Sequence, residues 1–289
     1  MRKCVQRGFV SAIFAAAPML AGTLTIPDSS LVASTQLYTD TTGSGIGNIV
    51  VMTGGGNAPG IGDPTGRNDD GFSGPINLGF SLNFFGATYT QFYINNNGNV
   101  SFGNGISDFT PTGPTGASQP IISPFFADVD TRGTNSGVVH LLQLSNEDII
   151  TWDHVGYFDS NDNLLNTFQL VLRGSGYNVP NGEGQIGFFY TTMQWETGDD
   201  SGGTNGFGGT PAAVGFGDGA GNGQVLQGSI QNGISGIVDD HHIWFDLNGS
   251  GVPVNPGGGA VPEPGSMGLL LLGGGVLAAG VRKRMRANR

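Results

Sequence analysis

The chain has 289 residues, of which only 11% are charged, and it contains 53 glycines and 18 phenylalanines. Between Asp28 and Glu263, three basic residues (Arg67, Arg132 and Arg173) stand against 22 acidic ones. So acidic a body repels nucleic acid and anionic lipid surfaces, and its aromatic content is too high for a disordered chain. We therefore exclude a nucleic-acid partner and expect a folded protein.

Residues 1–22 predict a signal peptide. MRKCVQR is a basic start, and the apolar stretch GFVSAIFAAAPMLAG ends in the small residues that signal peptidase requires before its cut. A short buried helix is the alternative, but the N-terminal position and the flanking basic residues favour an exported protein with signal peptidase as a partner. The one cysteine, Cys4, would be lost with this segment, so the mature protein would have no disulfide.

Residues 23–68 form a Gly- and Thr-rich N-terminal region. Its β-branched run over 48–52 predicts one loose strand between long loops.

Residues 69–247 predict an all-β domain. Alternation over 76–86 indicates a half-buried strand, and QFYINNNGNVSFG (91–103) indicates two short strands around a tight turn. The apolar run PIISPFFADVD (120–130) is typical of a central strand covered on both faces. Further strands are expected over 137–144, 148–158, 164–174 and 184–195, and in AAVGFGDG, GQVLQGS and HHIWFDL. About ten closely spaced strands and no amphipathic helix predict a sandwich-like domain of two sheets.

The remaining residues divide into a Gly/Pro linker, 248–260, and a C-terminal segment, 261–289. In that segment the apolar run 267–281 would span roughly 22 Å as a helix, against a bilayer core of about 30 Å. We expect a short membrane helix that anchors the protein transiently in the inner membrane, with its basic end in the cytoplasm. A permanent tail anchor is the alternative.

The stretch DDGFSGPINLGFSLNFFGATYTQFYINNNGNVSFG, followed by PIISPFFADVDTRGTNSGVVH, resembles the nidogen-like (NIDO) extracellular domain. WDHVGYF, NTFQLVL, GQIGFFY and GGTPAAVGF continue the pattern in order, and PFFADVD is its most specific part. The resemblance covers residues 69–247. It implies a role in extracellular matrix or adhesion and no catalysis.

The C-terminal segment resembles the PEP-CTERM sorting signal of Gram-negative bacteria that make exopolysaccharide. The resemblance implies recognition by exosortase, a membrane protease, followed by transfer to the cell surface or secretion. The matching residues are the motif Val261, Pro262, Glu263 and Pro264, and the basic membrane stop Arg282, Lys283 and Arg284. The tail continues for five residues beyond that stop, slightly more than is usual.

Calcium is the cofactor that the sequence suggests, because Asp-, Asn- and Gly-rich turns offer oxygen ligands. Asp128 and Asp130, at the end of the central strand, are the candidate ligands. The alternative is a structural network of Asp130 with Arg132. The turn DSNDN (159–163) is not an EF-hand loop, because it lacks the glycine at position six and has Leu170 at position twelve.

No catalytic residues are predicted. Asp153-His154 and the run Asp239-Asp240-His241-His242 place histidine beside acid, but the sequence shows neither a third partner nor an oxyanion site. Because HHIWFDL reads as a strand, its two histidines would face opposite sides and could not share one metal ion.

These observations support a non-enzymatic surface or matrix protein that is linked to exopolysaccharide or biofilm. Its β domain would bind exopolysaccharide or other surface proteins, with the three arginines and exposed amides available to contact sugars. The alternative is a secreted hydrolase of surface polysaccharide, which would need two carboxylates facing one cleft.

Overall fold

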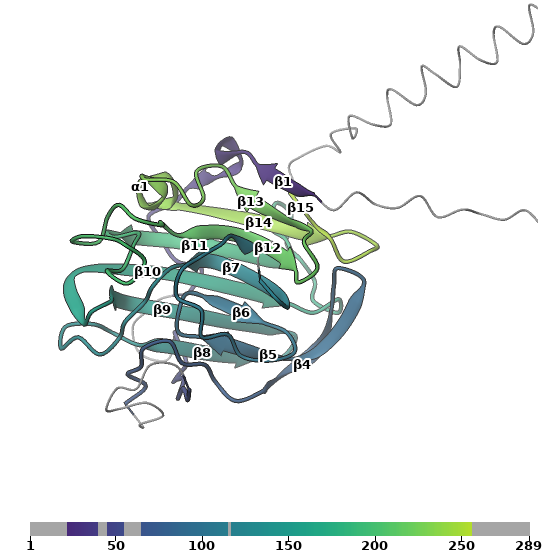
Figure 1. Cartoon of the computed structure of the whole chain (residues 1–289). Helices are drawn as coiled ribbons and strands as arrows, with labels where there is room; N and C mark the ends of the chain where they lie inside the picture. Colours follow the sequence, from purple (N-terminus) through teal and green to yellow (C-terminus); the bar gives the residue numbers. More distant parts are fainter. Residues whose placement is uncertain (1–21, 40–44, 55–64, 115–116, 256–289) are drawn as a thin grey trace, which may run out of the picture.

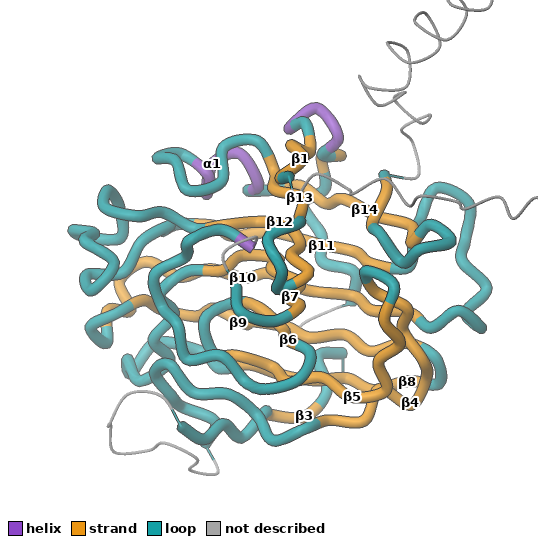
Figure 2. Tube along the Cα trace, turned by 45° about the vertical axis from the view of Figure 1, so that its right-hand side comes forward, coloured by secondary structure: helices purple, strands orange, loops and turns teal. Residues whose placement is uncertain are grey.

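A computed structural model describes residues 22–39, 45–54, 65–114 and 117–255. Within them the chain forms two β-sheets that lie one over the other (Figure 1). Apart from a short 3-10 helix, Asp28–Ser30, and the helix α1, Ile234–Val238, these residues are strands and loops (Figure 2).

The first sheet has seven strands, and β7 (Pro120–Phe126) lies in its middle. Strand β7 is buried over all residues but its first, which confirms the predicted central strand. All pairs in this sheet are antiparallel except β1 with β13, which is parallel. The order across the sheet is β1 (Thr23–Ile26), β13 (Gly223–Leu226), β12 (Ala213–Asp218), β7, β6 (Asn99–Ser101), β5 (Ala87–Asn95) and β4 (Ile76–Phe84).

The second sheet has eight antiparallel strands, and the long hairpin of β9 and β10 forms its centre. Its order is β15 (Pro253–Val254), β14 (His241–Leu247), β11 (Ile186–Met193), β10 (Asn161–Arg173), β9 (Glu147–Tyr157), β8 (Val139–Leu144) and β3 (Asn48–Ile49), and β2 (Val32–Ala33) also pairs with β14.

Aromatic side chains from both sheets fill the space between them. Phe216 of β12 stacks on Phe188 of β11 with ring centroids 5.3 Å apart, and Phe125 of β7 packs on Phe168 of β10 at 5.6 Å. Burial of so many aromatic rings supplies the main stabilising term of a chain without disulfides among its described residues.

The outer face of the second sheet is covered by the segment that carries Tyr38. Beneath it lies Arg173, whose side chain is fully buried and whose guanidinium is 4.2 Å from the ring of Trp244. Its Nε donates to Glu147 at 2.7 Å, and its Nη2 pairs with Glu183 at 2.6 Å. The buried charge is thus compensated by two carboxylates, as a buried arginine requires.

The predicted all-β, two-sheet fold is confirmed, and the structure has fifteen strands where about ten were expected. Two of the strands that were not expected, β2 and β15, contain only two residues, too few to leave a periodic signal in the sequence, whereas β3 lies in the run 48–52 for which a strand was predicted.

Two segments outside the predicted β domain also contribute strands. Residues 23–68, in which one loose strand between long loops was expected, contribute β1, β2 and β3. The expected linker 248–260 contributes β15, which pairs with β14. Short runs join a sheet wherever an edge strand offers unpaired backbone groups, and composition does not reveal this.

The expected signal helix (1–22) and C-terminal membrane helix (267–281) lie outside the described residues. Of the helices that the structure does describe, none has the length and apolar character needed to cross a bilayer.

Gly98 should be indispensable for the fold. Its φ is +74°, and a Cβ at this position would overlap the carbonyl oxygen of Phe125. We expect Gly98→Ala to lower the free energy of unfolding by about 3 kcal/mol or more, because it adds a steric clash to the cost of a positive φ. Gly182→Ala is the matched control, since Gly182 has φ +89° with no atom within 4 Å of its Cβ position. It should cost only about 1 kcal/mol. Urea denaturation measures both, and equal losses would contradict the steric argument.

Asp148 should make stability depend on pH. It is fully buried, its Oδ1 accepts from Gln143 at 3.1 Å, and its Oδ2 has no partner. Burial raises its pKa from 3.8 to about 7, so between these values the folded state binds more protons than the unfolded state. Stability should therefore fall as the pH rises from about 4 to about 7.

The variant Asp148→Asn removes this dependence. It should match the wild type near pH 4 and exceed it by about 1 to 3 kcal/mol at pH 8. The exposed Asp28→Asn should show no such gain. Urea denaturation across this pH range is the measurement, and a gain that is independent of pH would refute the assignment to Asp148.

Candidate metal centre

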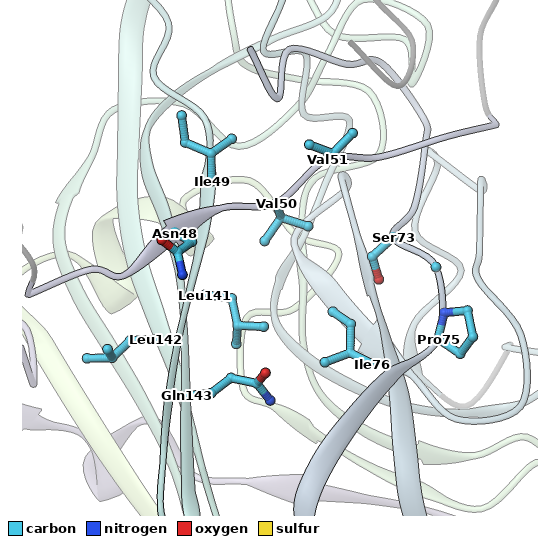
Figure 3. A pocket seen from close by; sticks show the side chains of 11 residues that line it. Asn48, Ile49, Val50, Val51, Ser73, Pro75, Ile76, Leu141, Leu142 and Gln143 are labelled. Atoms are coloured by element: carbon cyan, nitrogen blue, oxygen red, sulfur yellow. The ribbon is translucent and has the colours of Figure 1, made fainter. Parts of the chain in front are cut away.

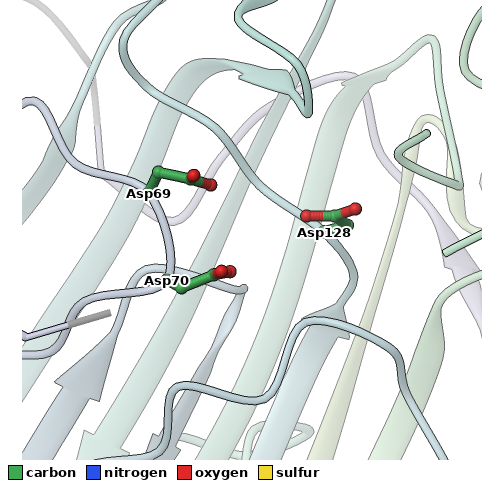
Figure 4. A group of neighbouring side chains, drawn as sticks. All are labelled: Asp69, Asp70 and Asp128. Carbon is green, nitrogen blue, oxygen red and sulfur yellow. The ribbon is translucent and has the colours of Figure 1, made fainter. Parts of the chain in front are cut away.

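Three carboxyl groups converge between two loops of the sandwich. Asp69 and Asp70 lie in the loop before β4, and Asp128 follows β7. One oxygen from each residue lies within 4.8 Å of the other two. Figure 4 shows the side chains of Asp69 and Asp70 directed toward Asp128. We refer to these three residues as the Asp cluster.

Backbone pairing brings the two loops together. Asp69 forms an isolated antiparallel bridge with Asp130. Beside it, the Thr131 amide donates to the Asn68 carbonyl at 3.0 Å, and the Asn68 amide donates to Thr131 Oγ1 at 2.7 Å. The acidic residues of the two loops are therefore held side by side by main-chain contacts.

Asn97, in the turn between β5 and β6, orients the carboxylate of Asp70. Its Nδ2 donates to Asp70 Oδ1 at 2.7 Å, and its Oδ1 accepts from the Val129 amide at 2.9 Å. Asp70 itself has φ +61°, and the next amide, of Gly71, donates to Asn68 Oδ1 at 2.6 Å. The positive φ turns the Asp70 side chain toward the other loop.

Asp130, the second predicted calcium ligand, contacts Arg132. The Nε of Arg132 donates to Asp130 Oδ1 at 2.8 Å, and the Ser160 amide donates to Asp130 Oδ2 at 2.7 Å. Arg132 Nη2 also reaches Asp69 Oδ2 at 2.8 Å. The structural network that the sequence offered as the alternative for Asp130 is thus present, and Asp128 is grouped instead with Asp69 and Asp70.

The carboxyl groups of the Asp cluster are largely buried, and some of their oxygens have no hydrogen-bond partner. Asp69 is 3% exposed and Asp128 is 1% exposed, and Asp69 Oδ1 and Asp128 Oδ2 have no hydrogen-bond partner. Burial, together with the neighbouring acidic groups, raises the pKa of Asp69 to about 7 and that of Asp128 to about 8. The pKa of Asp70 is also raised, mainly by burial.

The loop after β11 closes over Asp128. A Cβ on Gly198 would overlap Asp128 Oδ2, so only a glycine permits this approach. The Ser201 backbone amide bonds to Asp128 and partly offsets the rise of its pKa. The same loop supplies Asp200, whose charge adds to the negative potential at Asp128.

An arrangement of three carboxylates without nitrogen or sulfur ligands suits a hard cation. Sequence reasoning identified Asp128 but missed Asp69 and Asp70. The run NDDG was visible among the Asp-rich turns, but nothing local shows that it pairs with residues some sixty positions later.

The histidines that stand beside acidic residues in the sequence have separate neighbours in the structure. His242 stacks on Phe189 with ring centroids 5.2 Å apart, whereas His241 Nδ1 contacts the carbonyl oxygen of Asp239 at 2.7 Å. His154 is paired with its neighbour Asp153 at 2.6 Å and is more than half exposed. The residues of the sorting motif, 261–264, and of the basic stop, 282–284, lie outside the described part of the chain.

The three arginines of the body are engaged within the protein. Arg173 is buried and Arg132 is paired with acids, as described above. Arg67 donates to the carbonyl oxygens of Thr131 at 2.6 Å and Gly133 at 2.5 Å. Each of the three arginines that were suggested as sugar contacts thus already has polar partners within the protein.

Two of the grooves on the surface of the described residues bear on ligand binding. The first, of about 450 Å³, lies between β3, β8 and the start of β4. Figure 3 shows Val50, Leu141 and Ile76 around it. The second, of about 550 Å³, combines aromatic, amide and carboxylate groups. It is lined by Ser30, Val32, Val179, Pro180, Asn181, Gly182, Glu183, His242, Trp244, Asp246 and Asn255.

Comparison with known proteins adds two family matches. A family described as NIDO related matches residues 38–239, and the PEP-CTERM protein-sorting motif matches residues 260–284. The first match begins within the Gly- and Thr-rich region, upstream of the resemblance seen in the sequence.

Alpha-tectorin of Mus musculus and of Homo sapiens are each 33% identical over 52% of this chain and 8% of their own length. The Drosophila melanogaster protein nidogen is 28% identical over 32% of this chain and 9% of its own length. The chain thus spans less than a tenth of these relatives. No solved structure matches it significantly. Because the NIDO-related match covers well over half of its residues, the chain belongs to the NIDO-related family.

Proposed function

We propose that this chain is an exported, non-enzymatic surface or matrix protein that an exosortase-type protease processes at its C-terminal motif. The main observation behind this proposal is that one chain carries both family matches. The NIDO-related match covers residues 38–239, and the sorting motif follows at residues 260–284. The NIDO resemblance implies a place in extracellular matrix or adhesion, and the sorting motif accounts for delivery to the surface.

The sequence around the motif suits a protease at the membrane surface. Pro262 and Pro264 oppose helix formation on either side of Glu263, which favours an extended backbone. The short apolar run that follows would hold the chain only transiently in the inner membrane, and the basic stop would stay on the cytoplasmic side.

The second groove is the surface that we assign to a partner, exopolysaccharide. It places Trp244 and His242 beside the amide of Asn181 and the carboxylates of Glu183 and Asp246. Aromatic faces with nearby hydrogen-bonding groups can accept the apolar faces and hydroxyls of sugar rings. Because the body is acidic and its arginines are engaged, a neutral polysaccharide fits better than an anionic one.

A polysaccharide hydrolase, the alternative function, would need two carboxylates facing one cleft. The carboxylates of the Asp cluster converge, but they line neither groove. The second groove does hold two carboxylates, those of Glu183 and Asp246, but Glu183 is paired with Arg173 at 2.6 Å. These observations favour binding over turnover.

The C-terminus of the mature protein shows whether the motif at residues 261–264 is cleaved. Mass spectrometry of the protein recovered from the surface and medium of the native host should find a C-terminus between Val261 and Gly265. The variant Glu263→Ala should accumulate with Arg289 intact, because the protease loses its recognition residue. Pro256→Ala, outside the motif, should be processed as the wild type is. Wild-type protein exposed at the surface with an intact Arg289 would overturn the proposal.

Binding can be separated from turnover with purified full-length chain and host exopolysaccharide. Val32→Arg puts a bulky charge into the second groove and should weaken binding about tenfold, equivalent to about 1.4 kcal/mol. Leu144→Arg is the control, since Leu144 is similarly exposed (48% against 54%) and lines neither groove. Release of shorter saccharides would favour the hydrolase, and an equal loss in both variants would reject the groove.

A further inference from the structure

We propose that Asp69, Asp70 and Asp128 bind one calcium ion. This site goes beyond the proposed surface function and does not depend on it, because it rests only on the geometry of the folded body.

The spacing of the oxygens fits an ion. Calcium holds its oxygen ligands at about 2.3 to 2.6 Å, so two ligands on the same ion can be as much as about 5 Å apart. One oxygen from each residue of the Asp cluster lies within 4.8 Å of the others. The three carboxylates are therefore spaced closely enough to be brought onto one ion by small movements of the side chains.

Two buried oxygens in the Asp cluster lack a partner. Asp69 Oδ1 and Asp128 Oδ2 accept no hydrogen bond, and both residues are more than nine-tenths buried. Buried acceptors are nearly always satisfied, so two unpartnered carboxylate oxygens on neighbouring side chains of one cluster indicate a missing positive ligand.

The neighbouring arginine does not supply that ligand. Arg132 contacts the other oxygen of Asp69, Oδ2, at 2.8 Å, and its remaining contacts go to Asp130 and Asp159. Asp70 receives one amide hydrogen bond, from Asn97. Of the three carboxylates, only Asp69 is therefore paired with a basic side chain, and it is paired through one oxygen.

The ligand types favour calcium over other divalent ions. The Asp cluster offers only carboxylate oxygens, whereas zinc prefers nitrogen and sulfur. Magnesium demands a near-ideal octahedron, whereas calcium accepts irregular sets of six to eight oxygens such as two loops and solvent can provide. The ion would fasten the loop before β4 to the end of β7, next to the loop that carries Gly198.

Isothermal titration calorimetry on the full chain, stripped with EDTA, tests the proposal. Calcium chloride should bind at one site per chain with a dissociation constant of about 10⁻³ M or tighter, the range of extracellular modules and stronger sites. Magnesium chloride should bind at least about tenfold more weakly. Calcium should also raise the melting temperature, since it binds the folded state.

The variants Asp128→Asn and Asp70→Asn should each weaken calcium binding about tenfold or more, because each removes one ligand charge. Asp70 is only partly buried, so its variant should fold even where Asp128→Asn does not, and circular dichroism checks both. Asp159→Asn is the matched control, because the Asp159 side chain is 71% exposed, lies 3.7 Å from Arg132 Nη2 and does not belong to the Asp cluster. It should bind calcium within about threefold of the wild type.

Absence of saturable calcium binding by the wild type up to about 10 mM would overturn the proposal. Equal affinity for magnesium would refute calcium as the ligand, and an equal loss in Asp159→Asn would reject the three assigned ligands. None of these results bears on processing at residues 261–264, so the two proposals fail separately.

Discussion

The fold depends on a polar turn that is buried between the two sheets. The turn Asn96-Asn97-Gly98 joins β5 to β6 and is almost completely shielded from solvent. The carbonyl of Asn96 accepts from the indole of Trp152 in the opposite sheet, at 3.0 Å, and Asn97 receives the Val129 amide. A buried turn must satisfy its polar groups internally, so these contacts fix how the sheets meet. Gly98 then allows the close approach of the chain to β7 that brings the Asp cluster together.

The same turn links the packing of the core to the distribution of charge. Since Asn97 contacts both Asp70 and the residue after Asp128, the position of the carboxylates follows from the position of the turn. Arg132 neutralises only some of the acidic side chains around it. It pairs with Asp130 and with one oxygen of Asp69, and it leaves the rest of the Asp cluster without a basic partner. With only three basic residues between Asp28 and Glu263, the chain has few side chains that can neutralise buried carboxylates. A bound cation would supply the missing positive charge.

The sequence predicted the strands whose hydrophobic residues follow a regular pattern. Strands with clear alternation or continuous apolar character, such as 76–84 and 120–126, were located within a few residues, because each buries one or both faces. The two-residue strands 32–33 and 253–254 pair with the unpaired backbone of β14 and carry little pattern of their own. For the same reason, only one residue of the Asp cluster, Asp128, was named from the sequence. Asp128 ends an obvious strand, whereas Asp69 and Asp70 become its neighbours only through a bridge between distant loops.

The position of the last strand connects the fold with the proposed processing. Strand β15 ends at Val254 and the motif begins at Val261, so cleavage there would remove no strand of the sandwich. The twelve residues from 255 to 266 reach at most about 40 Å when extended, so until cleavage this end of the sandwich would stay within that distance of the expected membrane segment, which begins at Met267. The second groove includes Asp246 of β14 and Asn255 and therefore lies at that same end. Cleavage at the motif would free this end from the membrane, so the groove would be open to a long polysaccharide from every side.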